Sequence, residues 1–304
     1  RLKIFGTTVS TQSISALHLK KELDTACGSI DEKQIARLLF AADPYLWKRK
    51  GSELEEIRHR MGWLFLPENF TEHTHSLTTF SKQVKDEGYT HVVLLGMGGS
   101  SLCSEVARET YGSASGYPEL LVLDNTSPEA IRTLEKKITI GSTLFIVASK
   151  SGNTQETLCF FHYFYEQLQA QKIKDTGSHF IAITDDGTPL VKLAEQYAFR
   201  KIFLNPPDLG GRYSVLSDFG LVPMALMGID LSAFLKSARH MEISCSDIPA
   251  AANPGLSLGA MLGICQKHGR DKITFVLSTA INSFGYWVEQ LLAESKGREG
   301  KGLT

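Results

Sequence analysis

The chain has 304 residues, of which 42% are hydrophobic and 21% are charged, and its formal net charge is -1. This composition, with no apolar stretch long enough to span a bilayer, excludes an intrinsically disordered chain and a membrane protein. The near-zero charge excludes a general attraction to nucleic acid. An anionic ligand must therefore be held by local donors, which favours a small anion over a polymer.

The length exceeds what one hydrophobic core usually serves, so we expect two packed domains. The five cysteines are odd in number, widely spaced and never arranged as Cys-x-x-Cys, and no signal peptide is recognisable. These features favour reduced thiols in the cytoplasm. The chain starts at Arg1 without a methionine and stops at Thr304 in a polar, Gly-rich run, so we expect it to be part of a longer protein.

The predicted elements change in type near residue 90. Amphipathic stretches at 16–23, 31–40 and 52–63 predict helices, so we expect residues 1–88 to form a helical N-terminal segment that packs on the domains. Short β-branched and aliphatic runs then alternate with helices, which indicates an α/β domain with a parallel sheet and crossovers. The predicted strands are 91–95, 120–123, 143–148, 179–184 and 201–204.

Helix starts are marked by Ser127-Pro128, Thr188-Pro189 and Asn253-Pro254. We expect further helices at 215–227 and 231–241, and another strand at 272–278. The sequence therefore predicts a first α/β domain at 89–230 and the truncated start of a second one at 231–304.

The first candidate site is the loop Gly96-Met97-Gly98-Gly99-Ser100-Ser101, which follows an apolar strand and precedes a helix. Glycines let the backbone approach an anion, and a helix N-terminus presents N–H donors to it. Ser101 replaces the third glycine of the dinucleotide motif, although Asp124 stands where such a fold places its ribose-binding acid. Taken alone, the loop fits a nucleotide site, a sugar-phosphate site and a structural turn equally.

The second candidate is the run from Ser149 to Thr157, again between a strand and a helix. The hydroxyls of Ser149, Ser151 and Thr154, with the N–H groups of 151–154, suit a phosphate monoester, and Lys150 either supports that phosphate or is solvated. The alternative is that Asn153 or Thr154 merely caps the helix. The run Ser-Lys-Ser-Gly-Asn-Thr-x-Glu-Thr resembles the phosphate loop of sugar isomerase (SIS) domains. That resemblance implies a three-layer, flavodoxin-like fold with a five-stranded parallel sheet.

The third candidate is Gly210-Gly211-Arg212-Tyr213-Ser214. Taken alone, it favours an arginine paired with a carboxylate and Ser214 as a helix cap. However, Gly-Gly-Arg-Tyr-Ser-x-x-Ser-x-x-Gly resembles a signature of phosphoglucose isomerases. The resemblance implies that Arg212 is the cation that stabilises an enediolate in the transition state.

The fourth candidate is Glu294, near the C-terminal end of a helix with an apolar stripe. At that end the helix dipole raises the pKa of a carboxylate, which suits a general base. Glutamates on helices are usually solvated, so the residues alone favour a solvated side chain over that role. Phosphoglucose isomerases carry a catalytic glutamate in a Glu-Ser-x-Gly-Lys setting, which Glu294-Ser295-Lys296-Gly297-Arg298 resembles. The resemblance implies that Glu294 is the base that removes the proton from C2.

The resemblance extends over most of the chain and is greatest to the isomerase part of fused transaldolase/phosphoglucose isomerases. It implies interconversion of glucose 6-phosphate and fructose 6-phosphate in glycolysis and gluconeogenesis, with Gly99, Ser100 and the second loop on the phosphate. No cofactor, metal, nucleic acid or membrane is expected, and a homodimer is implied. The ring-opening histidine and lysine are expected after Thr304. A non-catalytic sugar-phosphate regulator and an isomerase of another sugar phosphate remain alternatives.

Overall fold

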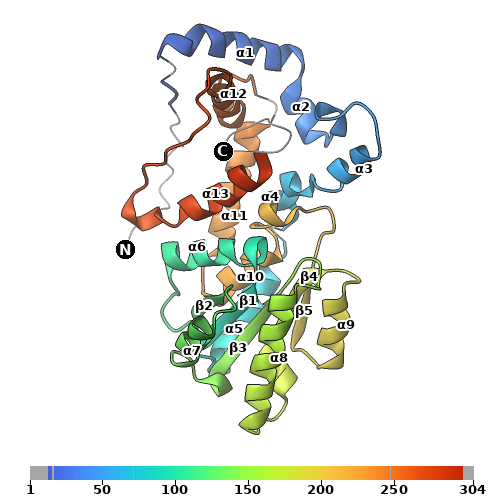
Figure 1. Ribbon diagram of the computed structural model, residues 1–304, viewed down its shortest axis with the longest axis vertical. Coiled ribbons are helices and arrows are strands. Elements are labelled where there is room, and N and C mark those ends of the chain that lie inside the picture. The colour runs from blue at the N-terminus through green and yellow to red at the C-terminus, as the bar shows by residue number, and fades with distance from the viewer. Residues whose placement is uncertain (1–12, 16, 71, 247, 297–304) are drawn as a thin grey trace.

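The computed structural model describes residues 13–15, 17–70, 72–246 and 248–296, and a single five-stranded sheet is its centre (Figure 1). All neighbouring strands are parallel and their order is β2-β1-β3-β4-β5. The strands are β1 (His91–Gly96), β2 (Glu119–Leu123), β3 (Thr143–Ala148), β4 (Phe180–Asp185) and β5 (Lys201–Asn205). Each predicted strand is confirmed to within one residue at either end.

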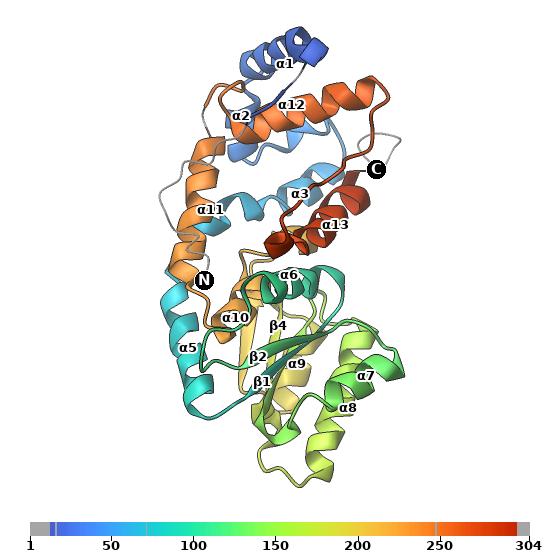
Figure 2. The ribbon, with the colours of Figure 1, turned by 90° about the vertical axis from the view of Figure 1, so that its left-hand side faces the viewer.

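The three inner strands form because their apolar runs are covered on both faces of the sheet, whereas the edge strands β2 and β5 are partly exposed. Every residue of β3 is buried, as is usual for the middle of a parallel sheet. Helices α5 (Thr74–Asp86) and α10 (Asp218–Leu226) cover one face, and α7 (Pro128–Glu135), α8 (Gln155–Ala170) and α9 (Pro189–Gln196) cover the other (Figures 1 and 2). The result is the predicted three-layer α/β sandwich.

Most of the remaining helices extend the molecule beyond one end of the sheet, whereas α6 (Leu102–Tyr111) also packs on the face that α5 and α10 cover. Figures 1 and 2 show α1 and α12 side by side at the far end, with α13 between them and α6. These helices are α1 (Lys20–Glu32), α2 (Ile35–Phe40), α3 (Glu53–Arg58), α4 (Leu66–Asn69), α6 (Leu102–Tyr111), α11 (Leu231–Cys245), α12 (Pro254–Lys267) and α13 (Phe284–Lys296). Among the described helices, none has the length and apolar character needed to cross a membrane.

Local sequence signals account for several helix starts. The Ser127 side chain accepts a hydrogen bond from the Glu129 N–H at 3.3 Å, and Asn253 accepts one from the Leu256 N–H at 3.0 Å. Both are the predicted caps of α7 and α12. At α9, Thr188 occupies the cap position, but its hydroxyl bonds that of Thr184 instead.

The predicted strand at 272–278 is wrong for the described part of the chain, because these residues form no β-ladder. A strand needs a hydrogen-bonding neighbour, and no described segment provides one here. The side chain of Val276 is consequently 95% exposed. The division at 88 and 230 and the start of a second domain stay predictions. The five cysteines are free thiols, as expected.

Candidate functional site

The first two candidate loops lie next to each other at the C-terminal edge of the sheet. Gly96 at the end of β1 and Ala148 at the end of β3 are partners in the parallel register. From β1 the chain crosses to β2 on one side, and β3 lies on the other side. Open α/β sheets bind ligands in the crevice at such a switch point. The topology therefore brings both loops to the position where a ligand is expected.

The loop after β1 turns tightly before α6 begins. The Ser100 N–H donates to the Met97 carbonyl at 3.1 Å, and the Ser101 hydroxyl donates to the Gly98 carbonyl at 3.2 Å. Ser101 is buried, whereas Gly99 and Ser100 are partly exposed. Gly98 is exposed and Met97 is partly exposed, so the accessible part of the loop runs from Met97 to Ser100 and includes the two residues assigned to phosphate binding.

Hydroxyl groups gather in the loop after β3. The Ser149 and Thr154 hydroxyl oxygens are 2.8 Å apart, and the Gly152 N–H donates to Ser149 Oγ at 3.1 Å. Ser151 is exposed and donates to Asn153 Oδ1 at 2.6 Å. Thr154 occupies the N-cap position of α8, yet it makes no side-chain capping bond. Helix capping therefore does not account for these hydroxyls.

Thr157, in the first turn of α8, is a further polar group that the sequence reasoning left without a role. Its side chain is fully buried, and Oγ1 has no hydrogen-bond partner among the described residues. A buried hydroxyl without a partner is costly, so such groups are expected to face a ligand or water. The sequence signal was its place three residues after Thr154, on the same side of the helix start.

The third candidate loop is held by the N-terminal segment of the chain. The Gly62 N–H donates to the Asp208 carbonyl at 3.1 Å, and the Trp63 ring stacks on Tyr213 with centroids 5.2 Å apart. We call these contacts the clasp. Together they fix the loop after β5 from both sides of Arg212, so the guanidinium is carried on a positioned backbone.

The same loop touches the loop after β1. A Cβ atom at Gly99 would lie 2.8 Å from the Gly211 carbonyl oxygen, closer than real side chains come. The Ser214 hydroxyl donates to that Gly211 carbonyl at 2.6 Å, and Ser217, not Ser214, caps α10. The alternative in which Ser214 serves as the helix cap is therefore wrong. Two loops far apart in the sequence meet here backbone to backbone.

Helix α13 reaches the same place. Arg212 lies with Gly99, Trp287 and Gln290 around a small gap, and the Gln290 amide nitrogen would be 3.3 Å from a Cβ at Gly98. Gln290 was not predicted as a site residue. Glu294 lies one helical turn further along α13, and its side chain is outside the described part of the structure.

Lys150 forms an ion pair with Asp185, the last residue of β4. Both side chains are largely shielded, with exposed fractions of 28% and 16%. Burial raises the pKa of the Asp185 carboxyl, and the hydrogen bond from Lys150 opposes that rise. Lys150 is therefore not simply solvated.

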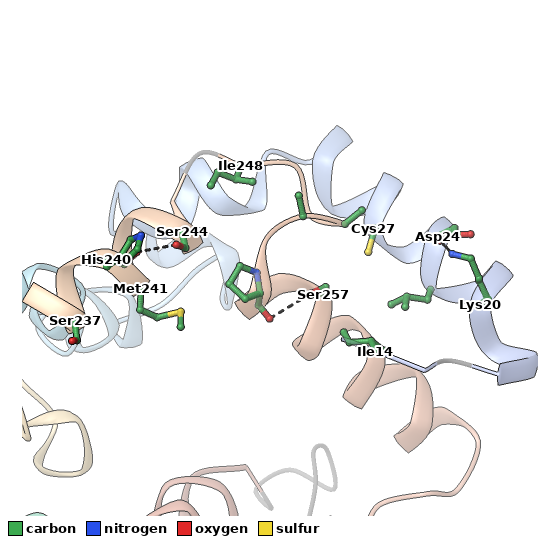
Figure 3. A pocket seen from close by; sticks show the side chains of 14 residues that line it. Ile14, Lys20, Asp24, Cys27, Ser237, His240, Met241, Ser244, Ile248 and Ser257 are labelled. Atoms are coloured by element: carbon green, nitrogen blue, oxygen red, sulfur yellow. Dashed lines mark hydrogen bonds and ion pairs between the residues drawn. The ribbon is translucent and has the colours of Figure 1, made fainter. Parts of the chain in front are cut away.

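A separate cavity of about 710 Å³ lies between α1, α11 and α12, away from the sheet (Figure 3). Its lysine and aspartate, Lys20 and Asp24, are paired with each other at 3.2 Å. Burial raises the pKa of the Cys27 thiol. The serine hydroxyls among its described lining residues bond to carbonyls of their own helices, so the loops at the sheet edge are the stronger candidate site.

Comparison with known proteins gives one consistent family. Residues 68–302 match the family model described as phosphoglucose isomerase. The chain is 32% identical over 219 residues to a glucose-6-phosphate isomerase of Methanocaldococcus jannaschii, covering 71% of this chain and 53% of that protein. It is 32% identical over 267 residues to one of Thermus thermophilus, covering 84% and 62%. The chain spans about half the length of the curated relatives it matches.

Solved structures agree with this match. A hypothetical protein of Thermus thermophilus superposes with a TM-score of 0.74 at 29% identity, covering 94% of this chain and 66% of that chain. A glucose-6-phosphate isomerase of Chlamydia trachomatis superposes with a TM-score of 0.66 at 20% identity, covering 93% and 58%, and so shares the fold. The sheet and the helices around it are therefore an arrangement already known in solved proteins.

Proposed function

The chain belongs to the phosphoglucose isomerase family, and on that premise we propose that the protein interconverts glucose 6-phosphate and fructose 6-phosphate. The observation that carries the proposal is the meeting of three loops at the switch point of the sheet, where Gly99 contacts Gly211 and the hydroxyl-rich loop starts beside Gly96. A small anionic ligand at this place is reached by phosphate donors on one side and by Arg212 on the other.

The phosphate of the sugar is expected at the N-terminus of α8. Ser149, Ser151 and Thr154 supply hydroxyls, and the first N–H groups of the helix are uncapped by side chains. Backbone N–H groups and hydroxyls around a helix start bind phosphate well. Ser100 and the Gly99 backbone approach from the neighbouring loop. Lys150 supports the same charge from within the hydroxyl-rich loop after β3.

The chemistry that follows is a proton transfer between two carbons. Glu294 removes the proton from C2 of the open-chain sugar, and the electrons form a cis-enediolate whose oxygen gains negative charge. Arg212 stabilises that charge because a guanidinium stays cationic throughout. A proton passes from O2 to O1 of the enediolate, and Glu294 returns the carbon-bound proton to C1. The C2 carbonyl and C1 hydroxyl of the ketose result, with no net gain or loss of protons. No redox cofactor takes part in this sequence.

The finer expectations belong to the whole protein. We propose a cytoplasmic homodimer active in glycolysis and gluconeogenesis, acting on a sugar phosphate and binding neither nucleic acid nor membrane. The fusion to a transaldolase and the ring-opening histidine and lysine after Thr304 stay predictions from the resemblance.

The test is a coupled assay of fructose 6-phosphate conversion on the natural full-length protein, with Glu294→Gln beside it. We expect the substitution to lower kcat by about a hundredfold to ten-thousandfold, as for loss of a general base. Glu289→Gln is the matched control, because Glu289 lies on the same helix and is exposed. Affinity for glucitol 6-phosphate, which cannot isomerise, should be kept in both variants.

Two results contradict the proposal. A full-length protein that binds sugar phosphates without turning over fructose 6-phosphate is either a regulator or an isomerase of another sugar phosphate, and mannose 6-phosphate separates those two. Full activity in Glu294→Gln would remove Glu294 as the base.

A further inference from the structure

Three polar residues form a row along the C-terminal edge of the sheet beside the hydroxyl-rich loop. Lys150 follows β3, Asp185 ends β4 and Asn205 ends β5. Asp185 and Asn205 are partners in the parallel register, and Lys150 is paired with Asp185. The row therefore runs over three neighbouring strands, and only its first member was predicted as a site residue.

The row lies on one face of the sheet. Side chains alternate along a strand, so Asp185 shares the face of Ile181 and Ile183, and Asn205 shares the face of Phe203. These three apolar residues belong to the same core cluster, which packs on α5 and α10. Neighbouring strands lie about 4.8 Å apart, and partners in the parallel register present their side chains on the same face. The Asn205 amide and the Asp185 carboxylate are therefore neighbours.

Two neighbouring groups of the row, Asp185 and Asn205, are incompletely paired. Asn205 is 3% exposed, and neither its Nδ2 nor its Oδ1 has a hydrogen-bond partner among the described residues. The same holds for Asp185 Oδ1, while Lys150 takes the other carboxylate oxygen. Native proteins rarely leave buried amides and carboxylates unpaired, so these atoms are expected to find a partner in another state of the site.

The backbone around Lys150 is fixed, so a change of partner must come from its side chain. The Lys150 carbonyl accepts hydrogen bonds from the Asp185 N–H at 3.3 Å and from the Thr184 hydroxyl at 3.4 Å. Gly152, with a φ of +69°, packs against Thr188. A lysine side chain is long and flexible and its ammonium can turn while its Cα stays in place.

We propose that Asn205 is a positioning residue for sugar-phosphate binding. When the ligand binds, the Lys150 ammonium turns from the Asp185 carboxylate to the phosphate, and the Asn205 amide then donates a hydrogen bond to that carboxylate. Without Asn205, that turn leaves a shielded carboxylate unpaired, and the ligand binds more weakly. The inference rests on the proposed function, because it takes the phosphate to lie in the adjacent loop. It concerns binding and leaves the proton transfer unchanged.

The test compares Asn205→Leu, which keeps the side-chain size and removes both polar atoms, with the unsubstituted full-length protein. We expect KM to rise about tenfold with kcat within about twofold, since hydrogen bonds to charged groups have roughly that effect. The dissociation constants of glucitol 6-phosphate and of inorganic phosphate, measured by calorimetry, should rise by the same factor. Asn205→Ala is the second variant if the leucine does not fold.

A double-mutant cycle with Lys150→Met separates a positioning role from a structural one. In the Lys150→Met protein, Asn205→Leu should cause no further loss of affinity, because no ammonium leaves Asp185. The proposal is overturned if Asn205→Leu lowers the melting temperature but leaves KM and ligand affinity unchanged. It is also overturned if Asn205→Leu lowers ligand affinity by the same factor in the Lys150→Met background as in the unsubstituted protein.

The calorimetric arm distinguishes the two proposals. If the full-length protein binds glucitol 6-phosphate but does not isomerise fructose 6-phosphate, the isomerase function fails and the Asn205 effect on affinity is still measured. If it binds neither glucitol 6-phosphate nor inorganic phosphate, both proposals fail.

Discussion

Replacing Gly99 with alanine tests whether the contact between two loops positions Arg212. The added Cβ would lie 2.8 Å from the Gly211 carbonyl oxygen, whereas ordinary contacts begin at 3.4 Å, so the backbones must separate by about 0.6 Å. The obstacle is a backbone atom and cannot rotate away. Because Gly211 precedes Arg212 directly, the guanidinium is displaced by a similar distance.

A misplacement of about 1 Å in an active site can cost about a hundredfold in rate, so we expect Gly99→Ala to lower kcat about tenfold to a hundredfold. The coupled isomerase assay on the full-length protein measures the rate, and thermal unfolding shows whether the fold is kept. Gly211→Ala is the matched control, since a Cβ there meets nothing within 4 Å. Gly99→Ala with an unchanged kcat, or Gly211→Ala with an equal loss, would refute the reasoning.

Two further predictions concern buried polar groups. Thr157→Val removes a buried hydroxyl that has no partner among the described residues, so the free energy of unfolding should change by less than about 1 kcal/mol. Affinity for glucitol 6-phosphate should fall about tenfold. An unchanged affinity would show that this hydroxyl does not face the ligand. His73 Nε2 lies 2.9 Å from Asp218, and this hydrogen bond raises the pKa of His73. The stabilisation of the folded state by protonated His73 is therefore complete below the pKa of about 6.5 that a histidine has in the unfolded chain. It disappears as the pH rises through the higher pKa of His73 in the folded protein. Since the imidazole is 36% exposed, we expect His73→Gln to lower the free energy of unfolding by only about 0.5 to 1 kcal/mol at pH 5.5 and by almost nothing at pH 8.5. Urea unfolding at the two pH values measures this difference, and equal losses at both would contradict the prediction.

The sheet could be predicted from the sequence because local and long-range requirements agree there. The strands are short apolar runs such as Val92 to Leu95, bounded by turn residues. A strand of a parallel sheet that is buried on both faces can be recognised from such a run alone. The loops that follow β1, β3 and β5 could be identified for the same reason, since motif and strand end coincide. The family match and the topology confirm the fold, and the roles of the site residues stay predictions.

Features that depend on neighbours distant in the sequence could not be predicted. The segment 272–278 has the residue types of a strand, but its pattern carries no information on whether a partner strand lies beside it. Asn205 looks like an ordinary turn residue before Pro206, and only the register of β4 and β5 places it against Asp185. Gln290 lacks any local signal, because its approach to Gly98 depends on how α13 packs.

The clasp has a consequence for the order in which the molecule folds. Its contacts join residue 62 to residue 208 and residue 63 to residue 213, and all five strands lie between these positions in the chain. Closing so long a segment is entropically costly until the intervening structure has already brought its ends together. We therefore expect the clasp to close only after the sheet has formed, so that the Arg212 loop gains its final position late in folding.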